Sequence, residues 1–239
     1  PFVLTAAGFL SLRRLVFAYP RHLLGWCAAR GLISANPLIG QRAPRSVPPR
    51  ERILTPDEIR KLWSATGTFS DLARLSLLTA QRKSSVTSMR WDDLDLERGI
   101  WTIPGDRMKS GRVHEVPLSD MAVRLLKARP TFKGPFVFGV GSDGQKPFGG
   151  ASKGMSGLRA SLLGEDWRKM EAPTWRLHDL RRTAVTFAQR GGAAIEEIRA
   201  LTQHKTPGVI GIYARHSYAV EKRRVVLLIA AQLDTILVR

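Results

Sequence analysis

The sequence predicts a mainly α-helical fold with a small antiparallel β-sheet. Apolar residues recur at intervals of three and four along most of the 239 residues, which is the spacing of amphipathic helices. In one stretch, two short runs rich in β-branched residues flank residues 105–112, a turn rich in glycine and charge, and this is the pattern of a hairpin. The length suffices for one large domain or two small ones.

Charge and composition narrow the classes of protein. Lys and Arg number 38 against 20 Asp and Glu, and the net charge of +18 indicates a polyanionic partner, most simply nucleic acid. The single cysteine, Cys27, excludes an internal disulfide and fits a reducing compartment. No apolar run is long enough to cross a membrane, and no signal-peptide layout is present. The chain begins with Pro1 rather than Met, which is typical of a fragment or a processed product.

The predicted elements follow in order. Residues 1–40 are predicted to be helical until Gly31 and the pair Asn36-Pro37 break the apolar pattern. Residues 41–52 contain three prolines and four arginines, and they predict an extended basic linker.

Clear helix signals follow the linker. Thr55, Pro56 and Glu58 form the pattern of a capping box at a helix start. A second helix is predicted from Ser70 or Asp71 onward, because leucines then recur on one face.

The hairpin and a loop come next. Residues 99–104 and 113–118 predict its two strands, and a helix is predicted from Ser119 to about Lys127. Residues 139–144 match G-x-G-x-x-G, but the residues after them do not suit the helix that a nucleotide-binding fingerprint requires, so a loop is predicted.

The candidate chemistry lies further along the chain. A helix is predicted to begin at His178, with Arg181 on the same face. His204 and Tyr213 follow it, with Tyr218 as a rival phenol. Arg offers a planar fork of donors to phosphate oxygens, Tyr can be a covalent nucleophile, and His can move protons near neutral pH. Together these side chains predict attack of a phenol on a phosphodiester without a metal.

This pattern resembles the C-terminal signature of the tyrosine recombinases, the phage integrase family. The signature consists of H-x-x-R at His178 and Arg181, then His204 after 23 residues, then Tyr213 nine residues later. Tyr218 lies 14 residues after His204 and fits this spacing poorly. The resemblance implies a tyrosine recombinase catalytic-domain fold.

Two upstream motifs extend the resemblance. Residues 77–96 resemble the first catalytic-arginine motif of the family and place Arg82 at its first phosphate-binding arginine. Lys109, 27 residues later in the hairpin turn, lies at the position of the catalytic lysine. Ser85 departs from the pattern, because the family usually has an acidic residue there that helps to hold the active-site side chains. The departure predicts a less firmly oriented Arg82 and reduced activity.

The resemblance also divides the chain. Residues 1–42 correspond to a partial helical core-binding domain that binds DNA, residues 43–52 to a linker, and residues 53–239 to the catalytic domain. The first of these is shorter than the family's domain, which predicts weaker site-specific binding. The apolar run 225–231 is predicted to pack against its own domain or a neighbouring subunit.

The implied activity is site-specific recombination of DNA in a mobile element, by integration or excision through a 3′-phosphotyrosine. The two arginines would clamp the phosphate, the lysine would protonate the leaving 5′ oxygen, the first histidine would help to take the proton of the tyrosine, and the second would hydrogen-bond the phosphate. The implied catalytic residues are Arg82, Lys109, His178, Arg181, His204 and the nucleophile Tyr213.

The implied partners are double-stranded DNA, a tetramer assembled on it and accessory DNA-bending proteins, with no cofactor, metal or membrane. The implied location is the cytoplasm, at the bacterial nucleoid. Two alternatives stay open. Ser85 and the short N-terminal region also fit a catalytically impaired DNA-binding remnant of an integrase. A strand-passing topoisomerase of similar chemistry would relax DNA without a preferred site.

Overall fold

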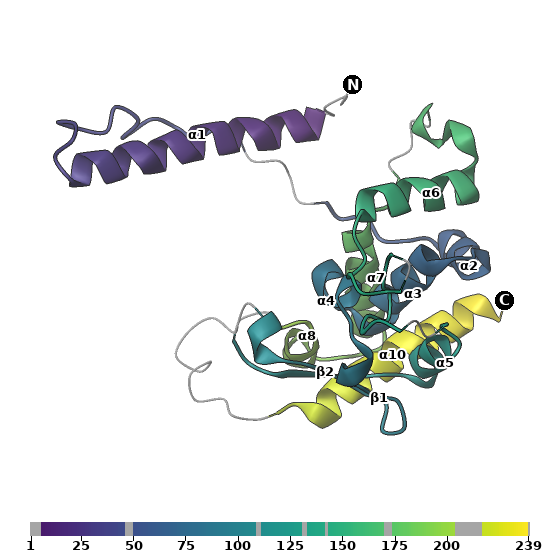
Figure 1. Cartoon of the computed structure of the whole chain (residues 1–239). Helices are drawn as coiled ribbons and strands as arrows, with labels where there is room; N and C mark the ends of the chain where they lie inside the picture. The colour runs from purple at the N-terminus through teal and green to yellow at the C-terminus, as the bar shows by residue number, and fades with distance from the viewer. Residues whose placement is uncertain are drawn as a thin grey trace. The chain divides into compact units, whose positions relative to one another are not determined.

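The structure is a computed structural model that describes residues 6–45, 50–108, 111–130, 133–141, 143–169, 174–203 and 217–238. The chain forms two compact units, Pro1–Glu51 and Arg52–Arg239. Figure 1 shows both units, coloured along the chain.

The first unit consists of helix α1, Ala6–Ala29, and an irregular segment after it. Asn36 ties this segment back to the helix, because its side-chain amide donates a hydrogen bond of 2.9 Å to the carbonyl of Arg21. The Oδ1 atom of Asn36 accepts a bond of 3.0 Å from the amide of Leu38. The predicted helix therefore forms, and it ends near the predicted break.

The second unit is built mainly from helices (Figure 1). They are α2 (Pro56–Ser64), α3 (Thr68–Thr79), α4 (Lys83–Thr87), α5 (Asp120–Lys127), α6 (Ala151–Leu163), α7 (Leu177–Arg190), α8 (Ile195–Thr202) and α10 (Ala219–Leu237). Three short 3₁₀ turns are η1 (Trp91–Asp93), η2 (Gly105–Arg107) and η3 (Glu165–Lys169).

The sheet has three antiparallel strands in the order β1 (Leu94–Asp95), β2 (Ile100–Ile103) and β3 (His114–Pro117). Trp101 pairs with Val116, and Ile103 pairs with His114. All four of these side chains are buried, because alternate residues of the two strands face the core. The predicted hairpin, and with it the predicted mainly α fold with a small antiparallel sheet, is confirmed.

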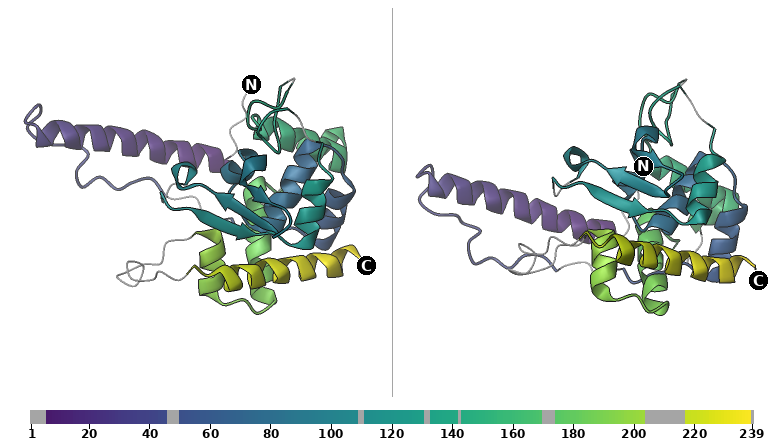
Figure 2. Two further views of the ribbon diagram at one scale, coloured as in Figure 1. Left: turned by 60° about the horizontal axis from the view of Figure 1, so that its bottom comes forward. Right: turned by 90° about the horizontal axis from the view of Figure 1, so that it is seen from below.

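The core lies between α3 and α7, which pack against each other, and α10 covers one side of it. Both views in Figure 2 show α10, in yellow, beside the green helices α7 and α8. The α10 side chains Val225, Val226 and Ile229 are buried in this core. The apolar run 225–231 therefore packs against its own unit, which is one of the two predicted possibilities.

Local signals set several boundaries. The amide of Glu58 donates to Thr55 Oγ1 over 3.2 Å and the amide of Thr55 donates to Glu58 Oε2 over 2.9 Å, so the predicted capping box is confirmed. The hydroxyl of Ser119 caps α5 as predicted. Gly192 ends α7 with φ +86°, a left-handed conformation that suits glycine.

Some elements differ from expectation. Helix α3 begins at Thr68, before the predicted start at Ser70 or Asp71, because Gly67 with φ +99° supplies the turn ahead of it. Residues 143–150 contain no helix, and Lys146 pairs with Val140 in an isolated bridge, so the loop prediction for the glycine-rich stretch is confirmed. None of the described helices combines the length and the apolar character needed to cross a membrane.

Candidate active site

Three of the six predicted catalytic residues, Arg82, His178 and Arg181, lie in the described part of the second unit. The other three, Lys109, His204 and Tyr213, lie outside the described residues. The site can therefore be built from the two arginines and the first histidine.

Arg82 follows a sharp turn at the end of α3. Ala80 adopts a left-handed conformation with φ 54°, and Arg82 then precedes the first residue of α4. Gln81, between them, is buried, and its side-chain amide donates to the carbonyls of Thr79 and Leu201. This anchoring directs the exposed Arg82 side chain toward the end of α8, where its Nη2 donates to the carbonyl of Gln203 over 3.3 Å.

Arg181 lies one turn into α7, and its guanidinium is buried. Its Nη1 donates to the carbonyl of Ala80 over 2.8 Å, and its Nη2 donates to the carbonyl of Thr202 over 2.5 Å. Two backbone carbonyls from different segments thus fix the plane of the Arg181 guanidinium. They accept from two of its five N–H donors. Such a held guanidinium is preorganised to bind an anion.

The two arginines repel each other. Burial, and after it the nearby Arg82 cation, lower the pKa of Arg181 to about 10. Two cations kept close together in this way are typical of an anion-binding site, since an anion placed between them would relieve the repulsion. A phosphodiester has the required charge and geometry.

His178 lies in the first turn of α7. Partial desolvation by the surrounding protein lowers its pKa first, and the Arg182 and Arg181 cations lower it further against the opposing Asp179 carboxylate. The imidazole is therefore neutral near pH 7 and can accept a proton. Arg82 also acts on it, which puts His178 in one electrostatic cluster with both arginines. His178 is largely exposed, whereas Arg181, three residues later on the same helix, is buried.

The first turn of α7 is fixed by Asp179. One carboxylate oxygen of Asp179 accepts a hydrogen bond of 2.9 Å from the amide of Arg176. The other forms an ion pair of 2.7 Å with Arg182. A buried carboxylate at a helix N-terminus stabilises that end of the helix, so the turn that carries His178 is held firmly.

His114 is a further member of the cluster that the motif analysis missed. It is the first residue of β3, and its Nε2 lies 3.0 Å from the carbonyl of Leu201 at the end of α8. Burial and then the Lys222 cation lower its pKa to about 4, and Arg181 and Arg82 act in the same direction. The alternation of the predicted strand, which places His114 on the inward face, was the signal that could have found it.

Ser85 occupies the position at which the resemblance predicts an acidic residue. Ser85 is half-buried on α4. Among the described residues no ion pair joins Arg82 to a carboxylate, and its Nη2 donates to one backbone carbonyl, that of Gln203. Reduced activity from the missing carboxylate stays a prediction.

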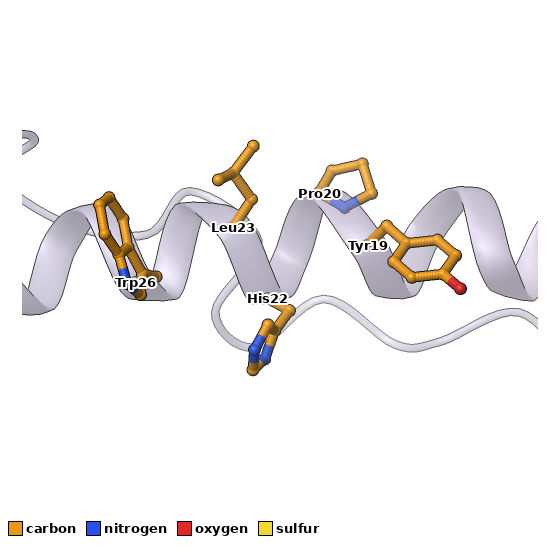
Figure 3. A pocket seen from close by; sticks show the side chains of 5 residues that line it. All are labelled: Tyr19, Pro20, His22, Leu23 and Trp26. Carbon is orange, nitrogen blue, oxygen red and sulfur yellow. The ribbon is translucent and has the colours of Figure 1, made fainter.

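Two further observations concern the first unit and the metal-binding residue types. A pocket of about 600 Å³ lies in the first unit on α1, and Figure 3 shows the side chains that line it: Tyr19, Pro20, His22, Leu23 and Trp26. Within the described residues, no three His, Cys, Asp or Glu side chains gather as metal ligands.

Comparison with known proteins decides the family. The sequence profile of the phage integrase family matches residues 52–219, which is more than half of the chain. The chain belongs to the phage integrase family. Arg82, His178 and Arg181 all fall inside the matched range.

Individual relatives agree with the family. The chain is 27% identical over 229 residues to the prophage integrase IntA of Escherichia coli (strain K12), a match that covers 92% of this chain and 53% of that protein. It is 34% identical over 123 residues to the tyrosine recombinase XerC of Xylella fastidiosa (strain M23), covering 49% and 40% of the two chains. The chain thus spans about half the length of the curated relatives that it matches.

Solved structures share the fold. A lambda integrase, solved as a tetramer bound to a Holliday junction, matches with a TM-score of 0.64 at 20% identity, covering 83% of this chain and 60% of that chain.

Proposed function

We propose that this phage integrase family member is a tyrosine-type, site-specific DNA recombinase. It breaks and rejoins DNA strands by metal-free transesterification through a 3′-phosphotyrosine intermediate. The observation that carries the proposal is the pair Arg82 and Arg181, two mutually repelling guanidinium groups, the buried one fixed by backbone carbonyls. The proposed domain organisation is a partial core-binding domain at residues 1–42, a linker at 43–52 and a catalytic domain at 53–239.

Arg82 and Arg181 would bind the non-bridging oxygens of the scissile phosphate. Preorganised donors stabilise the charge that develops in the transition state without having to reorient. The two hydrogen bonds that Arg181 donates to Ala80 and Thr202 support this role, because they fix the guanidinium before DNA binds.

Proton transfers would fall to the remaining residues. Tyr213 would attack phosphorus while His178 helps to take its proton, and the depressed pKa of His178 supports a neutral, accepting imidazole. Lys109 would protonate the departing 5′ oxygen, and His204 would hydrogen-bond the phosphate. The P–O bond to the 5′ oxygen breaks as the P–O bond to the tyrosine forms, so a later 5′ hydroxyl can reverse the step without ATP.

The proposed partners follow from charge and from the relatives. Double-stranded DNA is the proposed substrate, supported by the net charge of +18. A tetramer on DNA is supported by the lambda integrase structure, which was solved in that state on a Holliday junction. Accessory DNA-bending proteins, action within a mobile element and a cytoplasmic location at the nucleoid complete the proposal.

The test does not require knowledge of the target site. The protein is incubated with supercoiled plasmid in EDTA, the reaction is quenched with detergent, and relaxed topoisomers and DNA-linked protein are measured beside Tyr213→Phe. We expect relaxation and adducts in the wild type and neither in the variant. Wild-type protein that binds the plasmid in a gel shift but forms no adduct would contradict the proposal and favour a DNA-binding remnant. Relaxation of every plasmid without a preferred site, and without strand exchange, would favour a topoisomerase.

A further inference from the structure

Two neighbouring residues at the start of β3 hold the chain on both sides of residues 204–216. The His114 Nε2 atom lies 3.0 Å from the carbonyl oxygen of Leu201, near the end of α8. The carbonyl of the next residue, Glu115, accepts a hydrogen bond of 2.9 Å from Lys222 Nζ, in the first turn of α10. Residues 201 and 222 are thereby attached to adjacent positions of one strand.

We propose that His114 and Lys222 are positioning residues for strand cleavage: they fix the two chain ends that flank residues 204–216, and the first of these ends contacts the arginine pair. This inference rests on the proposed function, since that stretch contains the proposed residues His204 and Tyr213.

The chemistry of the two contacts supports a positioning role. His114 is 4% exposed and Lys222 is 6% exposed, so both polar groups are withdrawn from water. Burial of a polar group costs free energy unless a hydrogen bond offsets it, and an apolar side chain would fill the same space without that cost. Because the carbonyl of Leu201 can only accept, the imidazole of His114 must carry its proton on Nε2.

The same carbonyls connect these anchors to the arginine pair. The carbonyl of Leu201 also accepts a 2.9 Å bond from the Gln81 side chain, directly before Arg82. The next carbonyl, that of Thr202, accepts from Arg181. The end of α8 is thus held from β3, from the α3–α4 turn and from α7 at once, and a shift of β3 would move it relative to the phosphate-binding groups.

One short strand would therefore hold both ends of the nucleophile segment. Misplacement of a reacting group by about 1 Å can lower a rate by about 10²-fold.

The experiment uses the full chain with His114→Leu and Lys222→Met, which remove the donors but keep apolar bulk. His114→Gln retains an N–H donor and Lys222→Arg retains a cation, so both serve as rescue variants. Lys127→Met is the matched control, because Lys127 is exposed at the end of α5. Three quantities are measured: the rate of adduct formation on saturating plasmid in EDTA, the Kd for the plasmid, and backbone hydrogen exchange.

We expect both donor-removing variants to form adduct about 10- to 100-fold more slowly at saturating DNA, with little change in Kd. Backbone amides in residues 198–203 and 217–222 should exchange faster, while those of β2 stay protected. His114→Gln and Lys222→Arg should recover most of the rate, and Lys127→Met should match the wild type.

Wild-type adduct rates in both donor-removing variants would overturn the inference. So would a rate that falls only in proportion to the unfolded fraction, with β2 exchanging faster as well, since that result describes a purely structural role. Wild-type protein that forms no adduct would instead contradict the proposed function. Hydrogen exchange would still test whether His114 and Lys222 hold the two chain ends. Unchanged exchange at residues 198–203 and 217–222 in the variants would contradict that claim, whether or not adducts form.

Discussion

Arg181 combines burial, a depressed pKa and two carbonyl partners, and its planar fork makes both contacts at once. A lysine ammonium is a compact point charge that cannot span Ala80 and Thr202 in the same plane. We predict that Arg181→Lys lowers the rate of adduct formation by about 10²- to 10³-fold.

The control for Arg181→Lys is Arg190→Lys, the same change at an exposed position of the same helix. Plasmid adducts quantified over time give both rates. An Arg181→Lys rate equal to that of Arg190→Lys would show that the fork geometry is dispensable.

Ser85 lies where the resemblance to the tyrosine recombinases predicts an acidic residue. A glutamate there would lie three positions after Arg82 on α4 and could pair with its guanidinium. We predict that Ser85→Glu raises the adduct rate by about two- to fivefold, the size of a partly exposed ion pair. Ser84→Glu adds the same charge at a neighbouring exposed position and should leave the rate unchanged. Equal effects of the two glutamates would refute the specific pairing.

His114 makes stability depend on pH. Burial lowers its pKa from 6.5 in the unfolded chain to about 4 in the fold, together with the facing cations of Lys222, Arg181 and Arg82, while the Leu201 carbonyl opposes the shift. Between these two pH values the unfolded chain binds more protons than the folded chain. The free energy of unfolding is therefore highest above pH 6.5 and decreases as the pH drops toward 4. The pKa of His178 is also lowered in the fold, so this residue likewise makes the free energy of unfolding decrease as the pH falls.

We predict that this histidine alone removes about 3 kcal/mol of stability from pH 7 to pH 4. Urea unfolding of wild type and His114→Gln at several pH values isolates it, because the carboxylates titrate in both proteins. The wild-type curve should fall more steeply between pH 6.5 and 4. Parallel curves would contradict the assignment of a buried, neutral His114.

At the scale of elements, helix α6 offers a matched pair of glycines. A Cβ atom at Gly154 would lie 2.4 Å from Cδ2 of Phe69, whereas nothing lies within 4 Å of one at Gly157. Phe69 in turn packs against Phe148, with ring centroids 5.6 Å apart, and cannot move freely.

We predict that Gly157→Ala raises the free energy of unfolding by about 0.5–1 kcal/mol through helix propensity. Gly154→Ala should lower it by about 1–3 kcal/mol, because the added methyl overpacks the contact with Phe69. Urea unfolding at pH 7 measures both. Stabilisation of equal size by the two substitutions would show that α6 does not pack closely on Phe69.

Elements with local chemical signals could be predicted from sequence. The Thr55 capping box and the β2–β3 hairpin are of this kind, because cap geometry and alternation depend on residues close in the chain. Strand β1 was missed, since two residues carry no periodicity. The contact of His114 with α8 was missed for a different reason: it joins positions 87 residues apart, and such contacts depend on packing.

At the scale of the whole second unit, the site exists because the fold brings distant segments to one helix end. The α3–α4 turn supplies Arg82, α7 supplies Arg181 and β3 supplies His114, and all three donate to the last carbonyls around α8. The resemblance to the family's motifs predicted the two arginines and His178 as site residues. The arrangement that holds the arginines is a property of the packed core, and no short motif encodes it.

The central claim is that the phenol of Tyr213 becomes covalently joined to DNA. Trypsin makes this directly measurable, because Tyr213 falls in the peptide 206–215 and Tyr218 in the peptide 216–222. After incubation with plasmid in EDTA, nuclease and trypsin digestion should leave a nucleotide mass on one tyrosine peptide in the mass spectrum. We predict that the added mass is on peptide 206–215 and is absent from Tyr213→Phe. A nucleotide on peptide 216–222, or on neither peptide while the plasmid is relaxed, would contradict the assignment of the nucleophile.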